Sequence, residues 1–137
     1  MAFTGNFTCN VFKDALLVGG VDFATDVFKI ALYTNNATLN AQTLAYTSDG
    51  EAAGFGYTAG GEVIMPTLGT LNGVAYVSFA DVSWSGVITA RGALIYKVGS
   101  GNPAVCVLDF GADRTSNTVF TVGFPPATSD SALIRIS

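Results

Sequence analysis

Histidine is missing from this chain of 137 residues, and charged residues are scarce, at 12% of the total. The lack of histidine removes the usual general base of serine and cysteine catalytic triads, the commonest nitrogen ligand of bound metals and the side chain that titrates near neutral pH. The charged share is about half that of an ordinary globular domain. We therefore expect no catalytic residue, no cofactor and no metal site.

Basic residues are few as well: six lysines and arginines stand singly along the chain, and the net charge is −4. Binding to a phosphate backbone needs a clustered basic patch, so we expect no nucleic-acid partner and no anionic membrane surface. Two long uncharged stretches, Ile30–Ser48 and Val63–Ala80, are interrupted by polar residues, glycine or proline and do not fit a membrane span. The start lacks the positive region of a secretory signal. These features predict a soluble protein.

Cysteine occurs twice, as Cys9 and Cys106, which are far apart in the sequence. Cys106 lies in an apolar strand pattern, where a free cysteine behaves as a small hydrophobic residue. Without a secretory signal, two cysteines are more often reduced than bridged. We predict two free thiols.

Two patterns could in principle carry chemistry. The carboxylate pairs Asp109 with Asp113 and Asp49 with Glu51 could act as acid and base, but they are more simply interpreted as solvated acids in turns. The segment Gly54–Gly61 contains a G-x-G-x-x-A string, yet a dinucleotide site needs a strand before it and a helix after it. Neither context is present, which favours a mobile, glycine-rich loop.

Short alternating segments bounded by glycine and proline predict many short strands. The clearest unit is a hairpin of Gly92–Val98 and Ala104–Phe110, in which each arm offers one apolar face to a core. The fold class we predict is mainly β: a single antiparallel β-sandwich, jelly roll or small barrel of about seven or eight strands, in one domain spanning residues 1–137. The remaining strands are expected around Phe28–Tyr33, Val63–Met65, Tyr76–Phe79, Val82–Trp84, Phe120–Phe124 and Ile134–Ile136.

Two segments depart from the strand pattern. Cys9–Leu17 predicts a short N-terminal helix, with Thr8 as its N-cap and Gly19-Gly20 as its left-handed C-cap. Thr38–Gly61 predicts a long loop with at most one helical turn. Its small and polar residues suggest that it buries little apolar area, so we expect it to be mobile until the protein assembles with a partner.

Hydrophobic residues make up 50% of the chain, and the mean hydropathy is +0.46. So few charges cannot easily cover the surface of a domain of this size, which favours a surface covered by partner proteins. The alternative is that the many small residues, alanine above all, inflate the hydrophobic count. The residues we single out as interface candidates are Phe3, Phe7, Tyr57 and Trp84. Two alternatives stay open: Phe3 and Phe7 could close the domain's own core, and Trp84 or the tyrosines could present a sugar-binding surface.

Five stretches of this sequence are similar to a family of small virion proteins in tailed bacteriophages. They are distributed between residues 29 and 111, and none of them contains a catalytic motif. The stretches are Lys29–Thr34, Leu44–Thr47, Gly56–Gly61, Ala90–Tyr96 and Ala104–Gly111.

The resemblance implies a structural protein of the virion, made in the host cytoplasm. From its size and low charge we expect a capsid decoration (cement) protein on the capsid surface, with a tail or fibre-base protein as one alternative and a carbohydrate-binding β module as another. The expected partners are the major capsid protein and copies of the chain itself, in a homo-oligomer for which a trimer is favoured because capsids offer threefold positions.

Overall fold

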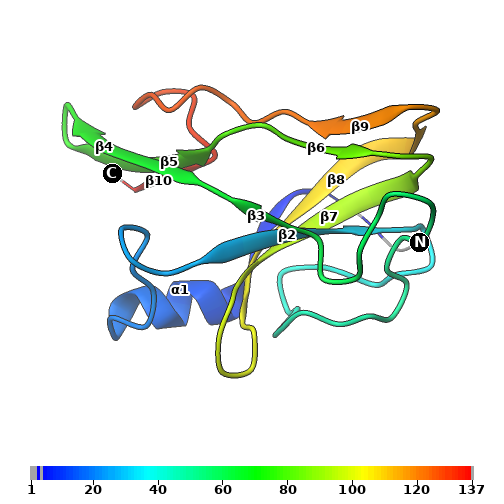
Figure 1. Ribbon diagram of the computed structural model, residues 1–137. Helices are drawn as coiled ribbons and strands as arrows, with labels where there is room; N and C mark the ends of the chain where they lie inside the picture. Colours follow the sequence, from blue (N-terminus) through cyan, green and yellow to red (C-terminus); the bar gives the residue numbers. More distant parts are fainter. Residues whose placement is uncertain (1–2, 4, 137) are drawn as a thin grey trace.

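The computed structural model describes residues 3 and 5–136. Over that range the protein is mainly β, with one short helix and ten strands in antiparallel sheets (Figure 1). The sheets pack as a sandwich and do not close into a barrel, so the predicted fold class is confirmed in its open, sandwich form.

The central layer is a five-stranded sheet with the order β1-β8-β7-β2-β3. Its strands are β1 (Phe7–Thr8), β8 (Ala104–Thr115), β7 (Thr89–Lys97), β2 (Phe28–Tyr33) and β3 (Glu62–Ile64). β7 and β8 are the longest strands and form the predicted hairpin, and β2 pairs along the other edge of β7. The sheet is therefore built around one local hairpin, to which strands distant in sequence are added.

Two smaller sheets form the layer above the central one in Figure 1. One has the order β10-β5-β4, from β10 (Ile134–Ile136), β5 (Val74–Phe79) and β4 (Pro66–Leu71). The other is the ladder of β6 (Val82–Ser85) with β9 (Val119–Val122). The helix and most of the connection 34–61 lie on the opposite side of the central sheet from β6 and β9 (Figure 1), whereas residues 54–57 reach β6.

The helix α1 (Asn10–Leu17) is one residue shorter at its start than predicted. Cys9 occupies the N-cap position and makes no side-chain cap hydrogen bond, so Thr8 does not cap the helix because it is part of β1. The predicted C-cap is confirmed: Gly19 has φ +74°, and the Gly20 N–H donates to a carbonyl of the last turn at 2.8 Å.

All eight predicted strand segments form strands, and two strands were not predicted. β4 begins at Pro66 and contains Gly69, which are both residues that disfavour strands in general. It is nevertheless possible because β4 is the edge of its sheet, where a residue without an N–H is tolerated at the first position. β1 has two residues, too few for alternation to be visible.

The centre of the five-stranded sheet is buried on both faces. In β7 the consecutive residues Ala93, Leu94, Ile95 and Tyr96 are all buried, although alternation predicted one apolar face. One face is covered by the smaller sheets, and the other is covered by the loop 34–61 with α1. Alternation within a single strand does not reveal these covering layers. A chain of this size thus has a core on either side of a single sheet.

Candidate interaction surface

Phe3 is buried in the domain itself, with 1% of its surface exposed. It packs over Gly92, where a Cβ atom would lie 2.4 Å from the ring, so this position accepts no side chain. The Arg91 guanidinium lies over the ring with its carbon 5.8 Å from the ring centroid and pairs with Asp109. Phe3 therefore closes the core, which was the alternative prediction, and it is not available as an interface residue.

Asp109, one member of the carboxylate pair with Asp113, pairs with Arg91 and holds the N-terminal segment. Partial desolvation raises its pKa, but the hydrogen bond from the Gly111 N–H and the pairing with Arg91 outweigh that effect, so the pKa lies below its ordinary value. The Asp109 N–H also donates to the Asn6 side chain at 2.6 Å. Asp113, its proposed partner, is exposed at the surface.

Trp84 is also a core residue, 2% exposed, and it packs between Tyr57 and Phe120 with ring centroids 6.1 and 6.3 Å away. A buried indole cannot offer a face to a sugar or to a partner protein, so the prediction for Trp84 is wrong. Phe7 and Tyr57 are partly buried and pack against the core. The reason is common to these residues: aromatic side chains bury more area than any other kind, and this domain uses them to close its two cores.

Glu51 organises the long loop on the underside of the sheet. Its carboxylate accepts hydrogen bonds from the Tyr46 hydroxyl at 2.6 Å, the Tyr57 hydroxyl at 2.5 Å and the Gly60 N–H at 2.7 Å. The Tyr57 oxygen in turn accepts from the Leu32 N–H of β2 at 3.0 Å. The prediction of a solvated acid is therefore wrong for Glu51, which is half-buried and accepts hydrogen bonds on both carboxylate oxygens.

Four tyrosines surround this carboxylate, and each has a pKa above its ordinary value because burial disfavours the phenolate. For Tyr46 and Tyr57, donation to Glu51 raises the pKa further. The tyrosines thus act as neutral hydrogen-bond donors and not as acids or bases. Their positions are Tyr33, Tyr46, Tyr57 and Tyr96.

The loop 34–61 is anchored to the domain, contrary to the expectation that it buries little apolar area. Leu39 and Ala52 are 2% and 5% exposed and belong to the core. The Tyr33 hydroxyl donates to the Thr47 carbonyl at 2.7 Å, and the Tyr96 hydroxyl donates to the Gly60 carbonyl at 2.6 Å. The loop has no helical turn. It covers the underside of the sheet as a third layer.

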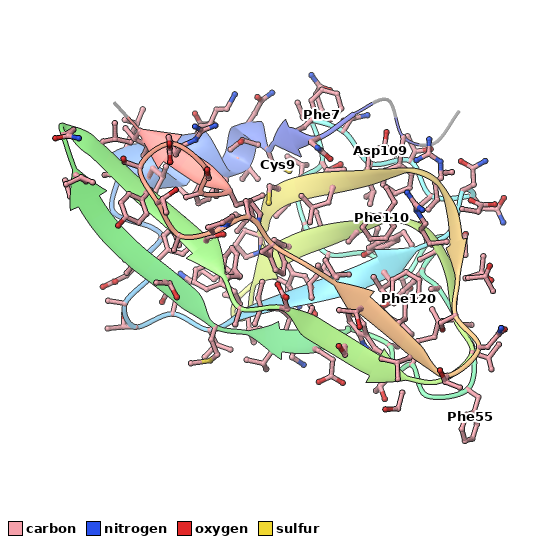
Figure 2. The ribbon with its side chains drawn as sticks, turned by 90° about the horizontal axis from the view of Figure 1, so that it is seen from above. Phe7, Cys9, Phe55, Asp109, Phe110 and Phe120 are labelled. Atoms are coloured by element: carbon pink, nitrogen blue, oxygen red, sulfur yellow. The ribbon has the colours of Figure 1, made fainter. Side chains whose placement is uncertain are left out.

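Phe55 is the exception to the burial of aromatic residues. Its side chain is 84% exposed and projects from one end of the molecule (Figure 2). Its backbone is fixed, because the Val87 N–H of the β6–β7 connection donates to the Phe55 carbonyl at 3.1 Å. Val87 is 53% exposed beside it. We call Phe55 with Val87 the apolar tip.

Glycines make the close approach at the apolar tip possible. A Cβ atom at Gly86 would lie 1.8 Å from the Phe55 carbonyl oxygen, and one at Gly56 would lie 1.9 Å from the Ser85 oxygen. Gly56 also has φ +92°, which favours glycine. Phe55 is not among the predicted interface residues, because the glycines around it are typical of a mobile loop. An aromatic residue flanked by two glycines was the signal available.

An apolar pocket lies at the opposite end of the molecule, between α1 and the inner face of the β10-β5-β4 sheet. Its volume is about 150 Å³, and its walls are aromatic and aliphatic side chains from the helix, from the segment that follows it and from the sheet. Leu68 and Ile136, on the two outer strands of that sheet, are 49% and 54% exposed. The walls include Phe12, Leu16, Phe23, Leu68, Val77 and Ile134.

A larger, open cavity of about 430 Å³ lies between β8 and β9. It arises from an irregularity in the β7–β8 pairing, where residues 110–113 of β8 stand opposite Arg91 alone. Phe110, Phe120 and the exposed Arg114 line it, together with hydroxyl and glycine residues. The lining residues include no carboxylate and no thiol, so the cavity offers no acid–base pair.

Within residues 3 and 5–136, no group of three or more cysteine, aspartate or glutamate side chains is placed to hold a metal ion. The same residues contain no helix long and apolar enough to cross a membrane. Both cysteines are buried thiols. The surface features that remain as candidates are the apolar tip, the apolar pocket and the cavity beside Arg114.

No family model, no curated protein and no solved structure matches this chain. The likeness to phage virion proteins therefore rests on the sequence stretches alone, and the function that it implies is carried forward as a proposal.

Proposed function

We propose that this protein is a structural component of a tailed-phage virion, most simply a capsid decoration protein that binds across joints between copies of the major capsid protein. The observation that carries the proposal is the surface. Large hydrophobic side chains stay exposed at both ends of the domain, Phe55 and Val87 at one and Leu68 and Ile136 at the other. With only 12% charged residues, such a surface favours contact with protein over contact with solvent.

The rigidity of the domain supports the same function. The sheet is covered on both faces, and the long loop is fixed by the Glu51 hydrogen bonds. A protein that reinforces a shell gains from a preformed surface, because little conformational entropy is then lost on binding. The cavity beside Arg114 is open and contains no acid–base pair, so it adds no support for an enzyme.

The experiment that tests the proposal is a reconstruction of the whole particle combined with quantitative mass spectrometry of its proteins. A decoration protein should occur in many copies and show density at the joints between capsomers. Density restricted to the tail, at a few copies per particle, would replace the decoration function with the tail alternative. Absence of the chain from purified particles would remove both.

A second measurement uses shells that lack the protein. Adding the purified protein should raise the temperature at which the shells open, because a ligand that binds the closed shell stabilises it by mass action. The apolar ends contribute most of the contact, so raising the salt concentration from about 0.1 to 1 M should weaken binding little, since screening acts mainly on exposed charges. A strong loss of binding with salt would contradict an apolar interface.

A further inference from the structure

The apolar pocket between α1 and the β10-β5-β4 sheet has the size and the chemistry of a site for one benzyl group. Its volume is about 150 Å³ and its walls are aromatic and aliphatic. Apolar cavities of about 150 Å³ in other proteins bind benzene. The pocket is open to the surface, because Ala75 on its wall is exposed and Leu68 is half-exposed.

The apolar tip supplies a group of that size. Phe55 is the one phenylalanine among the described residues that is almost fully exposed, at 84%. The hydrogen bond from Val87 and the close contacts at Gly56 and Gly86 hold its backbone in place. Burying a preformed phenyl group costs less conformational entropy than ordering a flexible loop.

The tip and the pocket lie at opposite ends of the domain (Figures 1 and 2). Phe55 therefore cannot reach the pocket of its own chain, but it can reach the pocket of a second copy. Neither part carries a charge: residues 52–61 and 82–90 contain no charged side chain, and neither do the walls of the pocket. No ion pair would need to be desolvated when the two meet.

We propose that Phe55 of one copy inserts into the apolar pocket of the next copy, so that the protein assembles head to tail. Two different surfaces meet in such a contact, and repeating it gives a closed ring when the rotation closes and an open chain when it does not. A ring of three would provide the trimer that a threefold position on a shell requires. The inference rests on the proposed function for its biological use, but the contact itself involves this chain alone.

Self-association of the purified full chain tests the contact. Sedimentation velocity across a range of concentrations should show oligomers for the native protein. Phe55→Ala removes the inserted group, and Ala75→Phe fills the pocket. Each should weaken association by at least about tenfold, as expected for a central aromatic contact. Leu44→Ala is the matched control, because Leu44 is an apolar side chain that is 71% exposed and belongs to neither the apolar tip nor the pocket. This substitution should leave self-association unchanged.

Mixing the two variants gives the sharpest result. F55A keeps an open pocket, and A75F keeps Phe55. In an equimolar mixture, Phe55 of an A75F chain can enter the pocket of an F55A chain, and no further contact of this kind can form. We expect each variant alone to be monomeric and the mixture to form dimers without larger species. Should A75F fail to fold, as judged by circular dichroism, Leu68→Asp at the half-exposed wall replaces it.

Three results would overturn the inference. The native chain could stay monomeric at all concentrations, the mixture could fail to form dimers, or A75F could lose binding to the shell while it keeps full self-association. The last result would assign the pocket to an aromatic residue of the capsid protein. Self-association is measured without shells, and shell binding is measured with them, so failure of this inference is distinct from failure of the proposed function.

Discussion

Glu51 shows how much of this structure depends on single polar residues. One carboxylate accepts three hydrogen bonds, from two tyrosine hydroxyls and a backbone N–H, at the place where the loop 34–61 crosses the central sheet. Charge-assisted hydrogen bonds of this kind are stronger than neutral ones. The loop contains no helix and no strand of its own, and this carboxylate acts together with the buried Leu39 side chain and backbone hydrogen bonds at the end of β2 to hold its path.

Replacing Glu51 by glutamine should destabilise the protein by about 1–3 kcal/mol, since the amide group is neutral and one of its two polar atoms donates instead of accepting. Tyr46 or Tyr57 would then face a donor. Urea unfolding followed by the fluorescence of Trp84 measures the free energy of unfolding. Glu62→Gln, on the exposed edge strand β3, is the matched control and should change the stability by less than about 0.5 kcal/mol. Equal effects of the two substitutions would contradict an anchoring role for Glu51.

The interface candidates illustrate why residues of the site were hard to predict. Phe3 and Trp84 were singled out because they are large and aromatic, but the same property makes them core residues. Exposure depends on which elements cover a strand, and that is set by contacts between residues far apart in the sequence. Phe55 could have been recognised locally, since two glycines leave an aromatic side chain without close neighbours in its own segment.

Among the elements, the Phe55 loop and the β6–β7 connection form a contact that tolerates no added side chain. The two backbones approach so closely that Gly86 has no room for a methyl group. A shift of either segment would move the apolar tip as a whole. The position of Phe55 is therefore set jointly by Gly56 in its own loop and by Gly86 in the β6–β7 connection.

Gly86→Ala should destabilise the protein by about 1–3 kcal/mol, because the added methyl group would overlap the Phe55 carbonyl and force the two segments apart. Gly123→Ala is the control: an added Cβ there meets its nearest atom at 3.7 Å, an ordinary contact distance. Thermal unfolding of both variants checks the difference. Hydrogen exchange at Val87, whose N–H donates to Phe55, should increase in G86A and stay unchanged in G123A. Similar stability of the two variants would show that the loops can separate freely.

The positions of the strands were predictable because most strands have a local signal in the sequence. Which faces of those strands are buried by other layers was not predictable in this way. Alternation located eight strands, including the β7–β8 hairpin, since side chains of a strand face opposite sides in turn. The same alternation placed Ile95 on the face opposite the core. Ile95 is in fact fully buried, because a layer built from other parts of the chain covers it. The edge strand β4 was missed because Pro66 and Gly69 conceal it.

For the molecule as a whole, the buried cysteine thiols and tyrosine hydroxyls determine how the free energy of unfolding changes at alkaline pH. Burial raises the pKa of the Cys9 thiol from 9.0 to about 11, although Lys13 lowers it slightly, and burial also raises the pKa of Cys106. The four tyrosines around Glu51 are raised in the same direction. Above their ordinary pKa values, the unfolded chain releases these protons while the folded protein keeps them.

The free energy of unfolding should therefore be steady at neutral pH and fall as the pH rises above about 9, with each released proton contributing a slope of about 1.4 kcal/mol per pH unit. Urea midpoints at pH 7, 8, 9, 10 and 10.5 measure this. Cys9→Ala should make the decline between pH 9 and 11 shallower, because one of the groups is gone. A stability that stays level or rises through this range would show that the groups are solvated in the folded protein.

The pairing of the central sheet also has a consequence for how the chain comes into being on the ribosome. β2 needs β7, with Phe28 opposite Lys97, and β1 needs β8, with Phe7 opposite Val107. β1, and the edge of β2 that does not pair with β3, thus stay unpaired until the late β7–β8 hairpin emerges. Such non-local pairing makes folding slow. In a cell, the interval before the hairpin appears is when the nascent chain is most exposed to aggregation with other chains.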